Sequence, residues 1–268
     1  MFEPILVHAH NPGVWTGDGN NTYLLVGEGG RATLIDAGQG KGAHLDLVDE
    51  HLWRHVGRLE QVLVTHGHHD HADGAAQVYR AHPAACFRKR AWPGQDDRFD
   101  VPWHEVADNE RVDLGGDVLV ALHTPGHAPD HMVFWHEASG TVFAGDLVMA
   151  KGSVMIHATG GGDLTAYLAS LERVRALRPS RLLPAHGAPI DDPERLLTRY
   201  IEHRLARETQ VLAAVAAGHA TVQAIAESIY DGLDSALLPG AHETVRAHLE
   251  KLRREGRAED DAGRWSTR

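Results

Sequence analysis

Four potential metal ligands lie within six consecutive positions of this 268-residue chain. They are His66, His68, Asp70 and His71, and they directly follow the apolar run of residues 61–64. Imidazole nitrogens and carboxylate oxygens are ligands that suit zinc and similar divalent metals. Since crowding them onto one turn has little structural use, the segment predicts a metal site and metal-dependent chemistry.

Three further candidates each stand just past the end of an apolar run that predicts a strand. These candidates are His127, Asp146 and His186. The preceding runs are residues 117–122, 141–144 and 181–185. Because ligands of α/β sheets bind at the carboxyl ends of strands, we expect these side chains to converge with the first four. Seven ligands suffice for two metals that share one carboxylate and each keep a position for water.

Strands and helices are expected to alternate along the first part of the chain. Residues 21–26 and 32–35 flank a glycine-rich turn and predict a hairpin. Apolar spacings of three and four predict helices over residues 43–55, 71–82 and 164–177. Further strands are expected at residues 61–65 and 131–135. Alternation of this kind predicts an α/β sandwich.

The pattern becomes helical near residue 193. Helices are predicted over residues 194–217, 221–230 and 241–255, followed by a two-stranded ribbon about Ala262-Gly263. Three helices and a small hairpin describe a winged helix. We therefore expect a catalytic domain at residues 1–192 and a small C-terminal winged-helix domain at residues 193–268.

The ordered ligands resemble the signature of the metallo-β-lactamase superfamily. Residues 65–71, Thr-His-Gly-His-His-Asp-His, are similar to its HxHxDH motif. The later motifs are matched in order by residues 124–127, Gly145-Asp146 and Ala185-His186-Gly187. The resemblance covers roughly residues 1–192 and implies an αββα metallo-β-lactamase sandwich.

The resemblance also implies how the ligands are divided between two metals. The first metal would be held by His66, His68 and His127. The second would be held by Asp70, His71 and His186. Asp146 would bridge them. We expect two Zn²⁺ per chain, with iron and manganese as alternatives, because His68 stands where the diiron flavoproteins of this superfamily carry glutamate.

The helices after residue 193 resemble the winged-helix appendage of one branch of the superfamily. Asn11-Pro12-Gly13 and residues 17–23 also resemble the opening motif of that branch. The branch includes an animal mitochondrial single-strand endoribonuclease and fungal polyketide thioesterases. This resemblance narrows the architecture more than it narrows the substrate.

Charge argues against a dedicated nucleic-acid binder. The formal net charge of the chain is -11, and residues 193–268 hold 11 Lys/Arg against 12 Asp/Glu. Phosphate contacts normally come from a basic patch. We therefore expect no sequence-specific DNA binding. The C-terminal helices are predicted to pack, to cover substrate or to dimerise, so a homodimer stays open.

Sequence features favour a cytoplasmic protein with no membrane partner. No run approaches the roughly 20 apolar residues of a membrane span. Residues 1–4 lack the basic and apolar regions of a signal peptide. The single cysteine, Cys86, leaves no internal disulfide within this sequence.

The expected reaction is hydrolysis by a metal-bridging hydroxide. Metal binding lowers the pKa of water from 15.7 to about 7, so no serine or cysteine nucleophile is required. Asp70 is predicted to orient the water and accept its proton. We expect a small acyl substrate, with a thioester favoured over a lactone or β-lactam.

Two other functions stay open. A metal-dependent endoribonuclease acting on single-stranded RNA follows from the branch resemblance, and the net charge counts against it. A non-catalytic sensor or regulator would use the winged helix as its output, and the complete ligand set counts against it.

Several neighbouring residues are expected to stay outside the ligand set. His69 is predicted to face solvent or support a ligand, and His131 is predicted to begin a strand. The remaining histidines of interest, His8, His10, His123 and His157, either line the cleft or are structural or incidental, and the second reading is favoured. Asp36 either accepts a hydrogen bond from a ligand or serves a plain turn.

Overall fold

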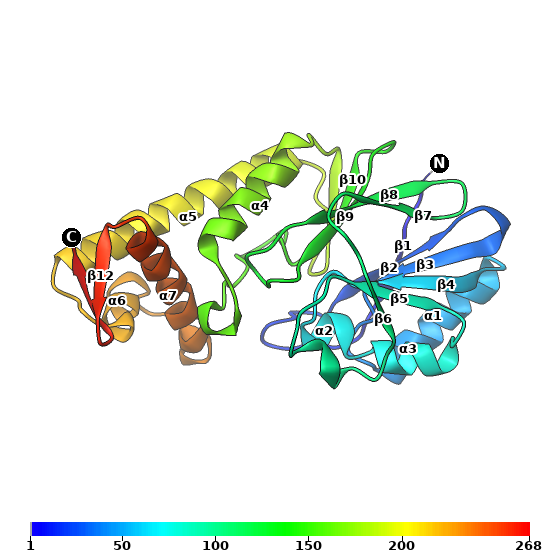
Figure 1. The fold of residues 1–268 in the computed structure, drawn as a ribbon, viewed down its shortest axis with the longest axis horizontal. Coiled ribbons are helices and arrows are strands. Elements are labelled where there is room, and N and C mark those ends of the chain that lie inside the picture. Colours follow the sequence, from blue (N-terminus) through cyan, green and yellow to red (C-terminus); the bar gives the residue numbers. More distant parts are fainter. Residues whose placement is uncertain (1) are drawn as a thin grey trace.

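Two β-sheets pack face to face in the first part of the chain (Figure 1). The computed structural model describes residues 2–268, so Met1 of the predicted catalytic domain lies outside the described residues. The first sheet has the order β1 (Ile5–His8), β2 (Asn21–Val26), β3 (Arg31–Ile35), β4 (Arg58–Leu63), β5 (Cys86–Lys89) and β6 (Trp103–Glu105). The second has the order β11 (Arg181–Pro184), β10 (Thr141–Gly145), β9 (Met132–His136), β8 (Val118–His123) and β7 (Glu110–Asp113). Each sheet is mixed, with parallel pairs from β3 to β6 and between β10 and β11.

The alternation of side chains along β2 explains how the layers form. Tyr23 and Leu25 point into the core between the sheets, where they meet Phe134 and Phe143. Leu24 points the other way, toward the helices on the outer face. This period of two is what a strand buried on both faces requires.

Helices cover both outer faces, which confirms the predicted αββα sandwich. The outer face of the first sheet is covered by α1 (Gly42–Arg54) and α3 (Ala75–Ala81). The second sheet is covered by α4 (Leu164–Ala176), whose Leu171 and Val174 pack against Val142 and Leu182. Burying such a side chain contributes about 1.5–3 kcal/mol.

The helix predicted over residues 71–82 is divided into α2 (His69–Ala72) and α3. The break falls where Gly74 crosses the β3–α1 loop and donates its amide to the carbonyl of Gly38 at 2.9 Å. A Cβ on Gly74 would lie 2.0 Å from the carbonyl oxygen of Ala37, so only glycine fits this crossing. The short strands β1, β5, β6 and β7 were not predicted. Polar residues interrupt the apolar pattern of the last three, whereas the apolar run of β1 is only three residues long.

The C-terminal part forms the predicted three helices and hairpin. They are α5 (Pro193–Ala216), α6 (Val222–Ile229), α7 (Leu238–Arg254), β12 (Ala258–Asp261) and β13 (Arg264–Thr267). Their own core contains Val211, Ile225, Leu249 and Trp265. Figure 1 shows α5 as the long yellow helix that carries these elements away from the sandwich.

The long helix α5 belongs to two cores. Leu197 and Tyr200 pack with α4 in the core of the sandwich, whereas Val211 and Val215 pack with α6 and α7. Asp192 caps the helix by accepting a hydrogen bond from the Arg195 amide at 3.2 Å. A domain boundary near residue 192 stays our proposal, with α5 as an element shared by both domains.

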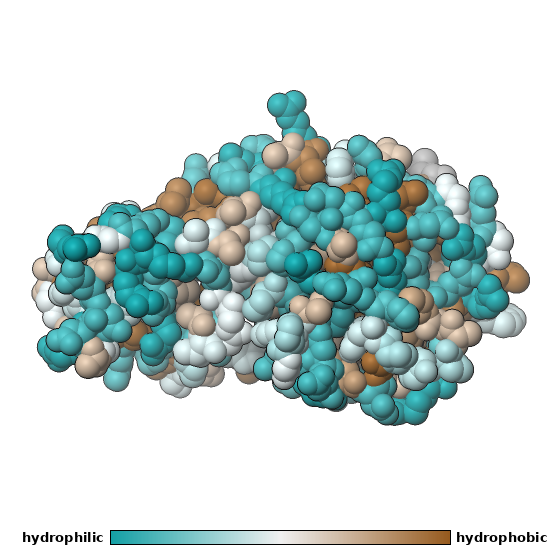
Figure 2. Space-filling model, in the orientation of Figure 1, coloured by the Kyte–Doolittle hydropathy of each residue, from teal (hydrophilic) through white to brown (hydrophobic). Residues whose placement is uncertain are grey.

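Hydrophilic side chains dominate the face shown in Figure 2, and apolar residues form small separate patches there. Within residues 2–268, no helix combines the length and the apolarity needed to cross a membrane.

Candidate metal centre

The loops that follow β4, β8, β10 and β11 bring all seven predicted ligands together. His66 and His68 lie between β4 and α2, while Asp70 and His71 lie on α2. The other three follow β8, β10 and β11 and are His127, Asp146 and His186. They form three overlapping groups in which one ligand atom from each residue lies within 4.8 Å of the others. The expected convergence at the strand ends is therefore observed, and the role of each residue as a ligand stays a prediction.

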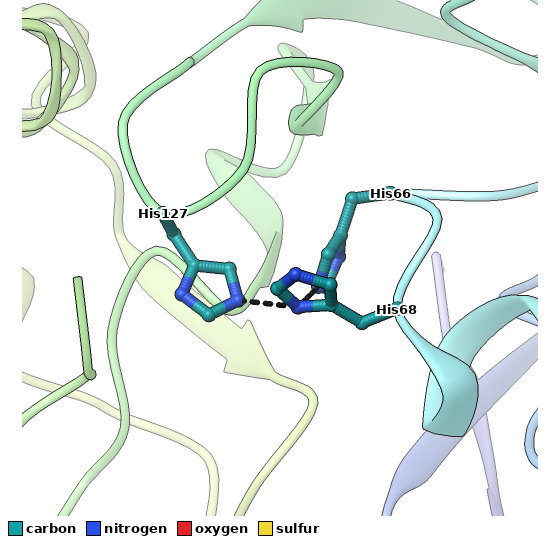
Figure 3. A group of neighbouring side chains, drawn as sticks. All are labelled: His66, His68 and His127. Atoms are coloured by element: carbon teal, nitrogen blue, oxygen red, sulfur yellow. Dashed lines mark hydrogen bonds between the residues drawn. The ribbon is translucent and has the colours of Figure 1, made fainter. Parts of the chain in front are cut away.

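The histidine group consists of His66, His68 and His127, whose rings converge in Figure 3. Nδ1 of His68 lies 2.9 Å from Nε2 of His66 and 2.9 Å from Nε2 of His127. Burial and the neighbouring imidazoles lower the pKa of His66 and bring the pKa of His68 to about 3. Burial also lowers the pKa of His127. All three rings are therefore neutral at pH 7, the form that binds a metal.

The acidic group consists of Asp70, His71 and His186. Nε2 of His186 lies 3.3 Å from Oδ2 of Asp70, and Nε2 of His71 lies 3.7 Å from the same oxygen. Burial lowers the pKa of His186, but Asp146 and Asp70 outweigh it and raise this pKa to about 10. Burial likewise opposes Asp36 and Asp146 at His71, whose pKa is raised well above its usual value. Burial raises the pKa of Asp70, but His71 and His186 hold it well below its usual value.

Asp146 lies between the two groups, and its two oxygens face different sides. Oδ1 is 3.4 Å from Nε2 of His71 and 3.2 Å from Nε2 of His186. Oδ2 is 3.5 Å from Nε2 of His127. Oδ1 is buried, yet no described residue gives it a hydrogen bond of good geometry. A buried acceptor of this kind needs a partner. The nitrogen and oxygen atoms around it are ligands that suit a divalent cation.

Asp36 orients His71 through a direct hydrogen bond. Nδ1 of His71 lies 2.7 Å from Oδ2 of Asp36, and both side chains are buried. Oδ1 of Asp36 accepts from the Thr65 amide at 2.7 Å. Of the two roles expected for Asp36, the structure therefore shows the first, in which it accepts a hydrogen bond from a candidate ligand. A carboxylate bonded to the far nitrogen of a ligating ring fixes its tautomer and orientation.

Three supporting residues were not predicted from the sequence. Nδ2 of Asn20 donates to Oδ2 of Asp70 at 2.8 Å. Asp130 and Lys89 are both buried, and Nζ of Lys89 lies 3.0 Å from Oδ2 of Asp130. The same oxygen accepts a hydrogen bond from the Gly67 amide at 2.8 Å, which holds the loop that carries His66 and His68. Asn20 belongs to the opening motif and carried a signal, whereas Asp130 and Lys89 are far from the loop in sequence.

The other histidines lie outside the ligand groups, as expected. Nε2 of His131 accepts from the Asp146 amide at 3.0 Å, and its Nδ1 lies 2.9 Å from Oγ1 of Thr124. His131, the residue before β9, thus positions the backbone of Asp146. His69 is exposed and contacts Asp73 at 2.8 Å.

The helix α5 holds the loop of residues 147–155 that follows Asp146. The Tyr200 hydroxyl contacts both the amide and the carbonyl of Met149 at 3.1 Å. The Arg204 guanidinium donates to the carbonyl of Val154. The adjacent carbonyl of Met155 accepts from Nδ1 of His127 at 2.9 Å, which leaves Nε2 free for a metal. The C-terminal part therefore reaches the histidine group through one short stretch of backbone.

A groove of about 630 Å³ opens beside His186. Its walls include Trp15, Met149 and Lys151. Trp15 and Val14 are 53% and 68% exposed, so this wall is apolar and accessible. A substrate bound in the groove would lie against the acidic group.

Residues 15–186 match the metallo-beta-lactamase superfamily, and residues 221–265 match the beta-lactamase associated winged helix domain. The chain therefore belongs to the metallo-β-lactamase superfamily and is a hydrolase of that superfamily, whose members bind divalent metals.

Named relatives and a solved structure agree with this assignment. The chain is 32% identical to a beta-lactamase-like protein 2 homolog of Drosophila melanogaster, over 92% of this chain and 86% of the fly protein. It is also 32% identical to an atrochrysone carboxyl ACP thioesterase of Aspergillus chevalieri, over 84% of this chain and 72% of that protein. A metallo-beta-lactamase family protein of Thermus thermophilus, TTHA1429, has the same fold with a TM-score of 0.82 at 23% identity. That likeness covers 99% of this chain and 98% of the other, so it includes the C-terminal part.

Proposed function

We propose that this protein is a dinuclear zinc hydrolase that cleaves thioesters of small acyl groups. The observation that carries the dinuclear site is the position of Asp146, whose two oxygens face different ligand groups. The thioester is supported by the similarity to a protein named as a thioesterase and by the apolar wall of the groove. Lactones and β-lactams are the next candidates.

The histidine group would hold one Zn²⁺ and the acidic group would hold the other. Asp146 would be a ligand of both ions. When bound, such ions make water reactive at neutral pH and polarise the carbonyl of the substrate. Asp36 and the carbonyl of Met155 keep the metal-facing nitrogens of His71 and His127 in place.

Asp70 is proposed to accept the proton of the attacking water. Its lowered pKa keeps it ionised at pH 7, and Asn20 fixes its carboxylate by donating to Oδ2. In the reaction the water oxygen adds to the acyl carbon, the C–S bond breaks, and the leaving sulfur takes up a proton. The acyl group would lie along Val14 and Met149.

Metal-depleted protein reloaded with zinc, iron(II) or manganese tests the proposal. Release of thiol from acyl-CoA and acyl-glutathione is expected with zinc, and the His68→Ala variant should lose at least about 100-fold in rate. His69→Ala is the matched control, because it removes an adjacent imidazole that is exposed.

Single-stranded RNA, lactones and β-lactams are assayed with the same preparations. Cleavage of RNA that depends on His68, without thioester hydrolysis, would establish the endoribonuclease alternative instead. Inactivity on every substrate, together with tight and salt-sensitive DNA binding, would favour the regulator.

A further inference from the structure

A second cavity lies along α5, and basic side chains line it. The α5 cavity measures about 250 Å³ and is lined by Trp15, Met155, His203, Arg204, Arg207 and Tyr230, among others. His203 and Arg207 follow Arg199 at spacings of four, so the three side chains form one stripe along the helix. Arg199 and His203 also line a neighbouring cavity beside Ser153.

No carboxylate in the described part of the chain pairs with these arginines. Within residues 2–268, no Asp or Glu oxygen lies within 4.0 Å of the guanidinium of Arg199, Arg204 or Arg207. Arg204 is only 2% exposed, and the Nε atoms of Arg204 and Arg207 are buried with no hydrogen-bond partner among the described residues. Burying a cation without a counter-ion is unfavourable by several kcal/mol, so this cavity is suited to an anionic ligand.

Glu208, the residue directly after Arg207, points to another side of α5 and shows the opposite arrangement. Glu208 pairs with Lys251 at 2.6 Å and with Arg257 at 2.8 Å, so the cations on that side are neutralised within the protein. The absence of carboxylates around Arg207 is therefore local to the cavity, in a chain whose net charge is -11.

Arg207 is held in an orientation that suits an anionic ligand. Its guanidinium carbon lies 4.3 Å from the centre of the Tyr230 ring. Contact with an aromatic face stabilises the charge and leaves the edge of the guanidinium free for paired hydrogen bonds to a phosphate. Burial and the nearby arginines lower the pKa of His203, as expected beside accumulated positive charge.

The α5 cavity lies beside the groove that reaches the metal centre, because the two share a lining residue. Trp15 lines both this cavity and the groove beside His186. Met155 lines the cavity, and its carbonyl holds His127. A ligand whose anionic end occupied the α5 cavity would extend along Trp15 toward the metals.

We propose that the α5 cavity binds a phosphate of the thiol carrier from which the acyl group is cleaved. The inference rests on the proposed thioesterase function. The carrier is a phosphorylated pantetheine arm, whose thiol holds the acyl group at one end and whose phosphate lies at the other. Arg207 and His203 contact the phosphate, and Trp15 and Tyr230 contact the less polar part of the carrier.

The test compares one acyl group on three carriers: pantetheine, 4′-phosphopantetheine and coenzyme A. In zinc-loaded Arg207→Gln protein, we expect kcat/KM for the phosphorylated carriers to fall about 10- to 100-fold, mainly through KM. The value for acyl-pantetheine should change no more than about twofold. Loss with acyl-phosphopantetheine identifies the 4′-phosphate as the ligand, whereas loss only with acyl-CoA identifies the nucleotide phosphates.

Two further variants control the test. Arg195→Gln removes the same charge from α5 but lies outside the cavity, and it should leave all three substrates unchanged. Arg207→Lys keeps the charge and should restore part of the lost affinity for the phosphorylated carriers.

Equal effects of Arg207→Gln on all three carriers, or no effect on any, would overturn the phosphate site while leaving the thioesterase intact. If no thioester is cleaved, the proposed function fails, and calorimetry with free coenzyme A decides the inference. Binding that weakens in Arg207→Gln would support the site, and absence of binding would overturn it. Cleavage of single-stranded RNA that depends on Arg207, with no such effect on acyl-CoA, would also overturn it.

Discussion

The histidine group and the acidic group share Asp146 but differ in the protons that they carry. Burial keeps the histidine group neutral at pH 7, whereas surrounding carboxylates keep His71 and His186 protonated. We therefore expect a cation that enters the histidine group to displace no proton and one that enters the acidic group to displace two. The histidine group can therefore bind a metal without losing protons. In the acidic group, the protons on His71 and His186 balance the carboxylate charges until a metal replaces them.

Removing the shared ligand should have the largest effect. Asp146→Ala is expected to lower kcat/KM by about 1,000-fold, because charge stabilisation by a bound metal amounts to several kcal/mol. Metal content per chain and thioester hydrolysis are the measurements. Asp73→Asn is the control, since the one side chain that this carboxylate bonds to among residues 2–268 is the exposed His69. Full activity in Asp146→Ala would show that Asp146 is not a metal ligand.

The metal affinities of the two groups should differ in their dependence on pH. Affinity at the acidic group is expected to rise by up to about tenfold per pH unit for each displaced proton, between about pH 6 and 8. Affinity at the histidine group should stay nearly constant. Calorimetry in buffers of different ionisation enthalpy counts the protons released by each equivalent of zinc. Equal proton release for both equivalents would contradict the comparison.

Asp36→Asn should weaken the acidic group more than the histidine group. Loss of a carboxylate bonded to a ligating histidine lowers metal affinity by about 10- to 100-fold. His71 contacts Asp36 directly, whereas His66 reaches it only through the Thr65 hydroxyl. Competition with a chelator measures the two affinities, and an equal loss at both groups would argue against separate support.

The protons of the acidic group should also affect stability without metal. Because the folded state raises the pKa of His186 from 6.5 to about 10, protonation stabilises the fold below pH 6.5, and this contribution is lost as the pH rises toward 10. The melting temperature of metal-free protein should fall by several degrees over this range. His186→Gln should reduce the fall. A slope unchanged by that substitution would contradict the assignment.

Tyr200→Phe should have the smallest effect. It removes hydrogen bonds to Met149, at a cost of about 0.5–1.5 kcal/mol in the free energy of unfolding, and it loosens the loop that supports His127. Denaturant unfolding and zinc titration measure the two consequences. Weaker binding is expected first at the histidine group, and an effect confined to the acidic group would show that the loop acts elsewhere.

The αββα sandwich and the convergence of the ligands could be predicted because each ligand stands at the end of an apolar strand in a recognisable order. Asp36 was visible for the same reason, at the end of β3. The supports from other elements were not visible. Tyr200 and Met149 are 51 residues apart, and Gly67 and Asp130 are 63 apart, so only the packed fold brings them together. The break at Gly74 was missed because its cause is a crossing chain.

The position of α5 in two cores sets the smallest fragment that can be an active hydrolase. The superfamily match ends at residue 186, yet Tyr200 and Arg204 fasten the loop beside the metal centre. A truncation at the end of the match would remove Leu197 and Tyr200 from the core that they share with α4, and it would also release that loop. The segment that matches the superfamily is therefore shorter than the segment that has to fold for activity, and a truncated enzyme should include α5.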